Sequence, residues 1–243
     1  MSQPADPSAP GRPAVLLLHG LSTTAATTWG DNGWIDLLHD AGRTVLAPDL
    51  MGHGGAPAPH DPAAYADFEG YVERYVTDAV GTDPIDGIGF SLGSRTSLAI
   101  AAADPGRYRR LVLSGVGANL FRTEADDHKE VLADAISGDA PPDDPSLAYF
   151  HRSVRAFGND PLAIAALLRR EAANPWTDKS LAAITCPVLL VIGDRDMAGP
   201  VDPLVERLTG AEVEVVTLKD TDHFATPKNF TFLDKALAFL ERP

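Results

Sequence analysis

Residues 89 to 93 of this chain, Gly-Phe-Ser-Leu-Gly, place a serine between two glycines. A serine hydroxyl acts as a nucleophile when it stands exposed beside a base and faces backbone N–H donors. A sharp turn from a strand into a helix achieves this exposure and forces the serine into a strained backbone conformation. Glycine at positions 89 and 93 removes side chains that would collide in such a turn. Ser91 is therefore the candidate nucleophile.

The residues around this motif have the strand-to-helix pattern that it requires. The apolar residues around Ile85 and Ile88 predict a short buried strand, and Leu92 to Asp104 predicts a helix that Pro105 and Gly106 end. The alternative is an ordinary strand-to-helix turn without chemistry, because the five-residue pattern alone is only moderately specific. A base and an acid elsewhere in the chain favour the first interpretation.

Two later loops offer that base and that acid. A histidine base needs a carboxylate that fixes its tautomer. Asp194 and Asp196 follow an apolar run that predicts a strand, and His223 follows the last predicted strand. Both loops are expected at the carboxyl edge of the sheet, together with Ser91. We favour Asp196 as the acid, with Asp194 as its competitor, and expect at least one of the two to make an ordinary loop turn.

The loop after the first predicted strand offers donors for a developing negative charge. The backbone N–H groups of Leu21 and Leu92 are the candidates to bind the oxyanion of a tetrahedral intermediate, and Gly20 permits close backbone approach. His19 is expected to tie loops together rather than to act as a base. The hydroxyl groups of residues 22 to 24 are weaker candidates to assist the oxyanion site.

The elements that position these residues alternate between strand and helix signals, which predicts an α/β fold with a mostly parallel sheet covered by helices on both faces. Further strands are predicted at residues 14–18, 44–47, 110–113, 188–192 and 212–218, and further helices at 33–41, 68–80, 203–208 and 230–240. Between them, residues 116–180 contain three helical patterns, at 123–136, 146–157 and 161–173, and no convincing strand. We therefore predict a core domain from residues 14–115 and 181–243, and a helical cap from 116–180 over the carboxyl ends of the strands.

Composition limits the partners and the compartment. The net charge of −14 and a pI near 4.7 argue against a nucleic-acid surface and against adsorption to anionic membranes. No apolar stretch reaches the length of a membrane helix. The single cysteine, Cys186, is expected in the core. Residues 1–13 are polar and rich in proline, so we expect a disordered leader rather than a signal peptide, and the cytoplasm as the compartment.

Segments along nearly the whole chain resemble the α/β-hydrolase fold family, in its branch of small capped hydrolases. They are VLLLHG at residues 15–20, APDLMGHG at 47–54, IGFSLG at 88–93, VLLVIGDRD at 188–196 and DTDHF at 220–224. The order Ser91, Asp196, His223 is also that family's order of nucleophile, acid and base. The family's acid ends a Gly-x-x-Asp segment, which supports Asp196. Its Asp-x-x-Gly-His-Gly loop is mainly structural, so His53 is not expected to be catalytic.

Two features depart from the family pattern. Few residues precede the first predicted strand, so we expect a trimmed sheet of about six strands. Ser94 stands where a glycine or alanine often follows the motif, and we expect it to tighten the packing of the helix without changing the mechanism.

The resemblance implies a serine hydrolase. The branch includes esterases, enol-lactonases, haloperoxidase-like esterases and carbon–carbon bond hydrolases. We expect cleavage of a carboxylic ester with a small or medium acyl group through Ser91, His223 and Asp196, with an ester-like small molecule and water as partners and no metal or organic cofactor. Lactone, thioester or carbon–carbon bond hydrolysis stays open, as does a small-molecule receptor built on the same fold. The sequence carries no signal for an oligomeric state.

The apolar residues of the predicted cap are expected mostly to pack it onto the core, and the remainder to line an apolar pocket. They are Leu120, Phe121, Leu147, Tyr149, Phe150, Phe157, Leu162, Leu167 and Trp176. Arg122, Arg152 and Arg155 are candidates to bind a carboxylate, although solvated surfaces explain them more simply.

Overall fold

The computed structural model describes residues 12–121, 125–171 and 176–242, and its centre is a six-stranded sheet. The strands are β1 (Val15–Leu18), β2 (Val45–Leu46), β3 (Ile85–Phe90), β4 (Tyr108–Ser114), β5 (Val188–Gly193) and β6 (Val213–Leu218). All neighbouring strands pair in parallel, in the order β2-β1-β3-β4-β5-β6. The predicted parallel α/β fold with a trimmed sheet is confirmed. Residues 1–11 of the predicted leader lie outside the described residues.

Helices connect successive strands, as parallel pairing requires, and α9 follows the last strand. They are α1 (Trp34–Asp40), α2 (Phe68–Val80), α3 (Leu92–Ala103), α4 (Ala125–Ser137), α5 (Pro145–Ala156), α6 (Pro161–Arg169), α7 (Asp178–Ala182), α8 (Asp202–Val205) and α9 (Phe230–Leu240). Short helical turns occur at Ala26–Gly30, Pro62–Tyr65, Ala118–Leu120 and Thr226–Lys228. The sequence predicted neither α7 nor these turns, and α6 ends at Arg169, before the end of the helix predicted at residues 161–173.

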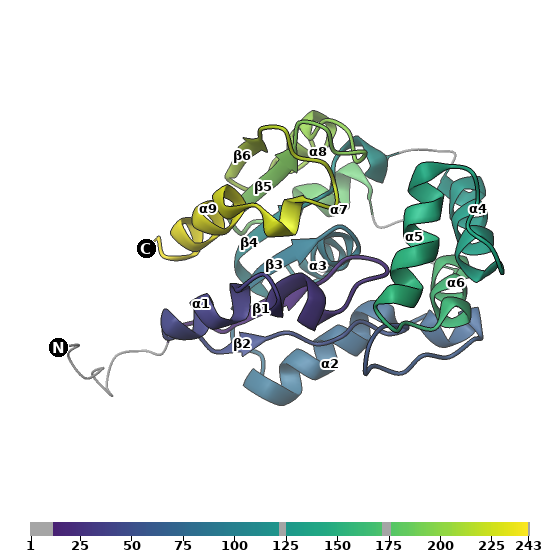
Figure 1. Cartoon of the computed structure of the whole chain (residues 1–243). Helices are drawn as coiled ribbons and strands as arrows, with labels where there is room; N and C mark the ends of the chain where they lie inside the picture. Colours follow the sequence, from purple (N-terminus) through teal and green to yellow (C-terminus); the bar gives the residue numbers. More distant parts are fainter. Residues whose placement is uncertain (1–11, 122–124, 172–175, 243) are drawn as a thin grey trace.

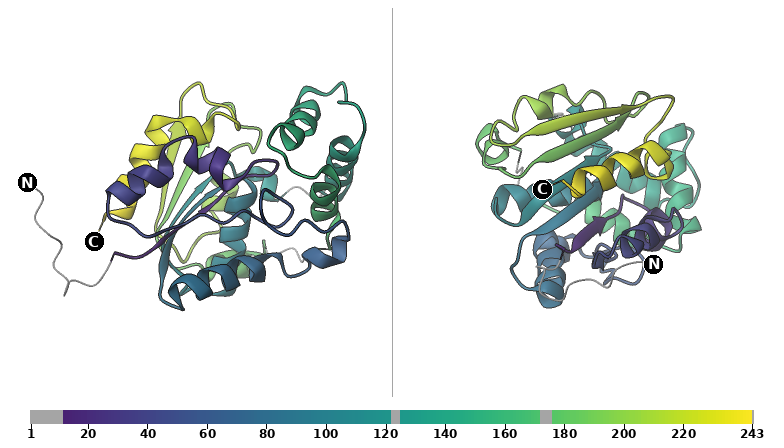
Figure 2. Two further views of the ribbon diagram at one scale, coloured as in Figure 1. Left: turned by 60° about the horizontal axis from the view of Figure 1, so that its bottom comes forward. Right: turned by 90° about the vertical axis from the view of Figure 1, so that its left-hand side faces the viewer.

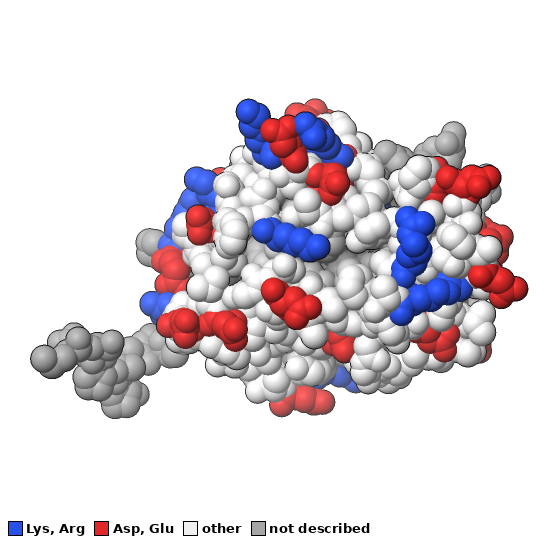
Figure 3. All heavy atoms as spheres, viewed as in Figure 1, with Lys and Arg blue, Asp and Glu red and all other residues white. Residues whose placement is uncertain are grey.

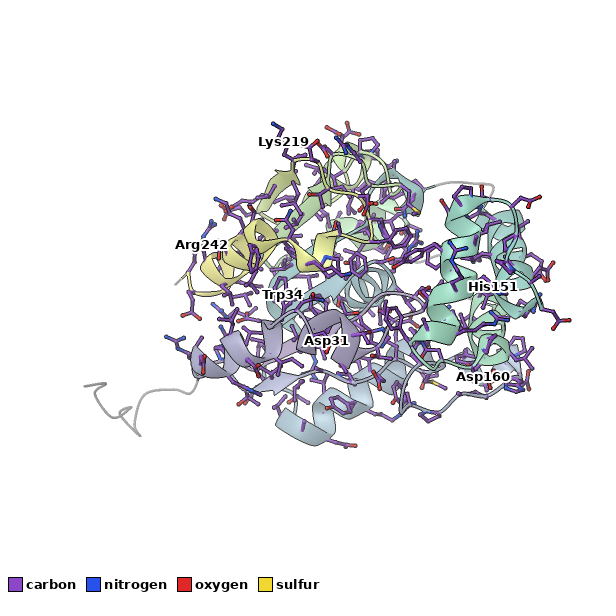
Figure 4. All side chains as sticks on the ribbon, viewed as in Figure 1. Asp31, Trp34, His151, Asp160, Lys219 and Arg242 are labelled. Atoms are coloured by element: carbon purple, nitrogen blue, oxygen red, sulfur yellow. The ribbon has the colours of Figure 1, made fainter. Side chains whose placement is uncertain are left out.

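Alternate residues of each strand face two separate apolar layers. Val15 and Leu17 pack with α1 and α9, whereas Leu16 and Leu18 pack with α2, α3, α7 and α8. This is the period of two that a strand buried on both faces shows. Figures 1 and 2 show the sheet between these two helical layers. In the first layer the ring of Trp34, labelled in Figure 4, packs against the ring of Phe232, and the two centroids are 4.7 Å apart.

Three helices, α4, α5 and α6, form an insert between β4 and β5. They enclose a small apolar cluster of Ile136, Val154 and Ile164. Asp144 and Asp160 cap the starts of α5 and α6 by accepting hydrogen bonds from backbone N–H groups. The insert lies at one end of the molecule, and His151 in α5 is far from Arg242 at the other end (Figures 1 and 4).

The amino edge of the sheet carries a buried charge cluster. Asp86, at the start of β3, is fully buried and accepts hydrogen bonds from Arg43 and from Arg109, whose Nε and Nη2 atoms lie 2.9 Å and 2.7 Å from its carboxylate oxygens. Arg43 also donates to the Pro13 carbonyl oxygen at 2.8 Å. The cluster fixes the start of β3, at the opposite edge from Ser91.

Cys186 lies in the apolar layer on the α3 side of the sheet with 6% of its surface exposed, as predicted, and burial raises its pKa to about 11. None of the described helices is long and apolar enough to cross a bilayer. On the face drawn in Figure 3, basic and acidic side chains are interspersed among uncharged residues.

Candidate active site

The turn between β3 and α3 has the strained geometry that the motif predicted. Ser91 has φ 53° and ψ −108°, a conformation that residues other than glycine rarely adopt. A side chain at Gly93 would overlap the carbonyl oxygen of Leu18, and a Cβ atom at Gly89 would lie 2.7 Å from the backbone nitrogen of Ser94. The two glycines are therefore required by close backbone contacts, and Ser91 is left partly exposed at the turn.

Ser94 fastens this turn to the neighbouring strand. Its hydroxyl group donates to the Ser114 carbonyl oxygen at 2.8 Å and accepts from the Ser114 N–H at 3.0 Å. The Ser114 hydroxyl donates in turn to the Gly89 carbonyl oxygen at 3.0 Å. These buried bonds join the first turn of α3 to β4 and to the end of β3, so Ser94 has the packing role expected of it.

The structure brings Ser91, His223 and Asp196 into one hydrogen-bonded chain. His223 Nε2 lies 3.0 Å from Ser91 Oγ, and its Nδ1 lies 2.8 Å from Asp196 Oδ1. Asp196 Oδ1 also accepts from the Ala198 N–H at 2.8 Å. The Asp196 side chain is fully buried, and its Oδ2 has no hydrogen-bond partner among the described residues. The carboxylate selects the tautomer with a proton on Nδ1, which leaves Nε2 free to accept from Ser91.

Asp194, the competing acid, has a different position. It is exposed, and its two carboxylate oxygens accept hydrogen bonds from the N–H groups of Asp220 and Thr221 at 3.0 Å and 3.1 Å. These bonds lower its pKa. Asp194 therefore stabilises the turn before His223, which is the loop role that the sequence left to one of the two aspartates.

The loop after β1 runs beside the Ser91 turn because β1 pairs with β3 up to Leu18 and Gly89. The Gly20 carbonyl oxygen accepts from the Thr23 hydroxyl at 2.9 Å and lies 2.9 Å from His19 Nδ1. A planar trans peptide directs the Leu21 N–H away from that carbonyl, so fixing Gly20 also orients Leu21. The Leu21 N–H has no acceptor among the described residues. Leu92 begins α3, where helix geometry leaves its N–H without an intrahelical acceptor.

His19 and His53 are buried structural residues. His19 Nε2 accepts from the Leu50 N–H at 3.0 Å, and His53 Nε2 accepts from the Ser22 N–H at 3.1 Å. Removal from water lowers the pKa of His19 to about 4 and that of His53 to about 3. Both rings are therefore neutral near pH 7 and hold the loops after β1 and β2 together. The sequence predicted this role for His19, whereas for His53 the family resemblance implied only a loop that is mainly structural.

A cleft of about 240 Å³ lies over Ser91 and His223. One wall is aromatic, and there the Tyr149 ring stacks on Phe224 with centroids 3.7 Å apart. A second wall, from the segment after β1, consists largely of hydroxyl, amide and carboxylate groups. The lining residues are Leu21, Ser22, Thr23, Thr27, Thr28, Asp31, Asn32, Phe90, Ser91, Tyr149, Phe150, Phe157, His223, Phe224, Pro227 and Lys228.

The sequence predicted the aromatic wall only in part. Among the nine apolar cap residues, three line the cleft: Tyr149, Phe150 and Phe157. Leu120, Phe121, Leu167 and Trp176 pack against the main core instead. Arg155 donates to the carbonyl oxygens of Ile136 and Gly138, so it caps α4, and Arg152 is exposed. Arg122 lies outside the described residues.

The polar wall was missed. Thr27, Thr28, Asp31 and Asn32 lie in and after a wide helical turn, and Asn32 Nδ2 donates to the Thr28 carbonyl oxygen at 2.9 Å. Their only signal in the sequence is a run of small polar residues after the His-Gly dipeptide. Among the described residues, no group of three or more His, Cys, Asp or Glu side chains is arranged to hold a metal ion.

These features agree with the comparison of the chain with known protein families. The sequence profile of the alpha/beta hydrolase family matches residues 15–238, which is nearly the whole chain. The protein therefore belongs to the alpha/beta hydrolase family, and the resemblance seen in its motifs is confirmed.

Curated relatives carry names of hydrolases that act on oxo-dienoates. The chain is 36% identical over 115 residues to a 2-hydroxy-6-oxo-2,4-heptadienoate hydrolase of Pseudomonas putida, covering 45% of this chain but only 40% of that protein. It is 27% identical over 227 residues to a 2-hydroxy-6-oxononadienedioate/2-hydroxy-6-oxononatrienedioate hydrolase of Cupriavidus pinatubonensis, covering 82% of this chain and 76% of that protein.

Solved structures share the fold at lower identity. An enol-lactonase from Burkholderia xenovorans superposes with a TM-score of 0.68 at 22% identity, covering 97% of this chain and 94% of that one. A thermophilic esterase from Thermogutta terrifontis superposes with a TM-score of 0.69 at 21% identity, covering 93% and 88%. Similarity at such low sequence identity shows a shared fold alone.

Proposed function

We propose that the protein is a serine hydrolase that cleaves a carboxylic ester of a small or medium acyl group. The observation that carries this proposal is the hydrogen-bonded chain from Ser91 through His223 to the buried Asp196, which opens into a cleft. In this proposal Ser91 is the nucleophile, His223 the general base and acid, and Asp196 the group that orients and stabilises the histidine.

The reaction proceeds through an acyl-enzyme. His223 Nε2 takes the proton of Ser91 as Oγ attacks the carbonyl carbon of the ester. The tetrahedral intermediate collapses when the same nitrogen returns that proton to the departing alcohol. A water molecule, deprotonated by His223, then attacks the acyl carbon and releases the acid and Ser91. General acid–base catalysis of this kind typically accelerates the reaction by about 10²–10⁴-fold.

The N–H groups of Leu21 and Leu92 bind the oxyanion in this mechanism. Two features of the site support these assignments: the Leu21 N–H is unpaired among the described residues, and Leu92 begins a helix whose dipole favours negative charge. Loss of one such donor typically lowers kcat by about 10²–10³-fold.

The cleft supports an uncharged substrate of modest size. Its volume of about 240 Å³ is below the roughly 300–1,000 Å³ of many ligand sites. Among its described lining residues, the only acidic side chain is that of Asp31 and the only lysine or arginine is Lys228. We further propose that residues 116–180 act as a cap, because Tyr149, Phe150 and Phe157 of that segment form the aromatic wall.

A carbon–carbon bond hydrolase is the second candidate, and the relative that matches 82% of the chain favours it. A substrate named as a dienedioate carries two carboxylates. Among the described residues that line the cleft, Lys228 is the only lysine or arginine. This poor match in charge places ester hydrolysis first.

Turnover assays with a graded substrate set test the proposal. p-Nitrophenyl acetate, butyrate and octanoate, a phenyl thioester, γ-butyrolactone and an oxo-dienoate are compared for wild-type protein and Ser91→Ala. We expect repeated turnover of the shorter esters and a loss of at least about 10⁴-fold in Ser91→Ala. Retained activity in Ser91→Ala contradicts the proposal, faster cleavage of the dienoate favours the second candidate, and a single burst with a stable adduct favours a receptor.

A further inference from the structure

Ser22, the residue after the proposed oxyanion donor Leu21, has a backbone conformation that serine does not favour. Its φ is +68°, in the left-handed region that is populated mainly by glycine and asparagine. Ser22 is 1% exposed, so water does not stabilise this turn. Surrounding groups must therefore hold the residue in place.

Three polar side chains bind Ser22 from outside its own loop. His53 Nε2 accepts from the Ser22 N–H at 3.1 Å, and Asn159 Nδ2 donates to the Ser22 carbonyl oxygen at 2.7 Å. Ser153 Oγ lies 2.8 Å from Ser22 Oγ. Each of the three partners is at most 6% exposed. The amide, the carbonyl and the hydroxyl group of Ser22 are thus all engaged in the interior.

Two of these three partners come from the insert. Ser153 lies in α5, and Asn159 follows α5 and precedes α6. Asn159 also joins two core loops, because its Oδ1 accepts from the Gly54 N–H at 2.8 Å while its Nδ2 binds Ser22. Figure 1 shows α5 as the helix of the insert that faces the sheet. The backbone around Ser22 is therefore held from the insert as well as from the core.

The bond to the N–H of Ser22 acts directly on the neighbouring peptide. The carbonyl of Leu21 and the N–H of Ser22 share one planar unit, and the N–H of Leu21 belongs to the unit before it. With Gly20 fixed on one side of Leu21 and Ser22 fixed on the other, the backbone angles of Leu21 have little freedom. Release of Ser22 toward its preferred right-handed region would rotate the Leu21 N–H.

We propose that Ser153 and Asn159 are positioning residues, through which the docked insert holds Ser22 in its left-handed conformation and so aims the Leu21 N–H at the oxyanion. This inference rests on the proposed function, because it assumes the oxyanion role of Leu21. The insert then contributes to the chemical step in addition to lining the cleft.

The first test is Asn159→Ala, with Ser153→Ala as a milder variant. An oxyanion donor acts mainly in the transition state, so we expect a 10- to 100-fold lower kcat for p-nitrophenyl butyrate in Asn159→Ala, with KM changed less than threefold. Ser153→Ala is expected to lower kcat three- to tenfold. Inhibition by phenylboronic acid, which forms a tetrahedral adduct with serine, is expected to weaken in parallel with kcat. The control is Ser137→Ala, a serine of α4 whose hydroxyl donates to the Ala133 carbonyl oxygen.

The second test is rescue by glycine at position 22. Glycine adopts a positive φ without strain, so Ser22→Gly makes the conformation less dependent on the insert. We expect the double variant Asn159→Ala/Ser22→Gly to recover at least fivefold in kcat over Asn159→Ala, with Ser22→Gly alone measured as its reference. A structural defect of the insert alone would not be rescued in this way.

The outcomes separate the inference from the function on which it rests. If Ser91→Ala abolishes turnover but Asn159→Ala keeps wild-type kcat, or if glycine at position 22 gives no recovery, the inference is wrong and the proposed function stands. If Ser91→Ala retains turnover, the proposed function itself fails. If Asn159→Ala does not fold, Ser153→Ala alone and combined with Ser22→Gly decides the question by the same criteria.

Discussion

Replacing Asp196 by asparagine removes one negative charge from the candidate site while keeping its shape. Oδ1 of Asp196 accepts from both His223 Nδ1 and the Ala198 N–H, so the amide oxygen of asparagine is expected to take that place. The new amide nitrogen then lies where Oδ2 was buried without a partner among the described residues. The hydrogen bond to the histidine survives, and the electrostatic stabilisation of its protonated form is lost.

The distance sets the size of this loss. His223 Nδ1 and Asp196 Oδ1 are 2.8 Å apart, and the centres of the two charges are separated by about 4 Å. At an effective dielectric constant of about 20, the attraction between unit charges over these distances is about 4–6 kcal/mol. Each 1.36 kcal/mol corresponds to about tenfold in rate. We therefore expect Asp196→Asn to lower kcat by about 10³–10⁴-fold.

Asp194→Asn is the matched control, because it makes the same substitution two residues away. Asp194 binds only backbone N–H groups at the surface, so its variant is expected to lose less than about tenfold in kcat. Steady-state turnover of p-nitrophenyl butyrate, with urea unfolding to confirm folding of each variant, provides the comparison. Asp196→Asn within tenfold of wild type, or a larger loss in Asp194→Asn, would refute the assignment of the acid.

Three further perturbations test the scaffold. A histidine in the unfolded chain has a pKa near 6.5, whereas burial lowers the pKa of native His53 to about 3. Between these two values the unfolded state binds a proton that the native state does not, so the free energy of unfolding falls as the pH falls. His53→Gln is therefore expected to remove about 3 kcal/mol of the stability difference between pH 7 and 4.5 in urea titrations, and an unchanged pH dependence in this variant would contradict the reasoning. Gly93→Ala is expected to cost about 3 kcal/mol or more and most of the activity, since its Cβ overlaps the Leu18 carbonyl oxygen; a stable, active variant would contradict the packing argument. Asp86→Ala removes the buried carboxylate that pairs with Arg109 and Arg43, although Arg43 keeps its ion pair with Glu241 at 3.2 Å. The variant is expected to cost about 3–5 kcal/mol in urea unfolding while kcat/KM of the folded protein is unchanged. A mainly kinetic effect would show that the two edges of the sheet are coupled.

Much of the fold was predictable because its signals are local. The short apolar runs at β1 and β5 and the Pro105-Gly106 stop after α3 depend on residues adjacent in sequence, and the helix α2 was predicted with the bounds that the structure has. The short helix α7 was missed because five residues give too little periodicity to recognise. The cap boundaries at residues 116 and 180 stay a prediction.

The approach of Ser91 to His223 was also predictable, because parallel strands place their carboxyl-terminal loops at one edge. The Asp196 assignment needed the family pattern in addition, since two aspartates follow β5 within three residues of each other. The sequence could not predict the polar wall at Thr27 to Asn32 or the contacts of Ser22 with the insert. They depend on the docking of segments more than a hundred residues apart, which no local pattern encodes.

The single cysteine of this chain, Cys186, can distinguish a misaligned active site from a destabilised fold in each of these variants. Cys186 is enclosed beneath the sheet and resists ionisation, so a disulfide reagent added to native protein finds no reactive sulfur. Modification then proceeds only as fast as the core opens. A substitution at Asn159 or Asp196 that slows turnover without accelerating this reaction has altered the alignment of groups in an intact molecule.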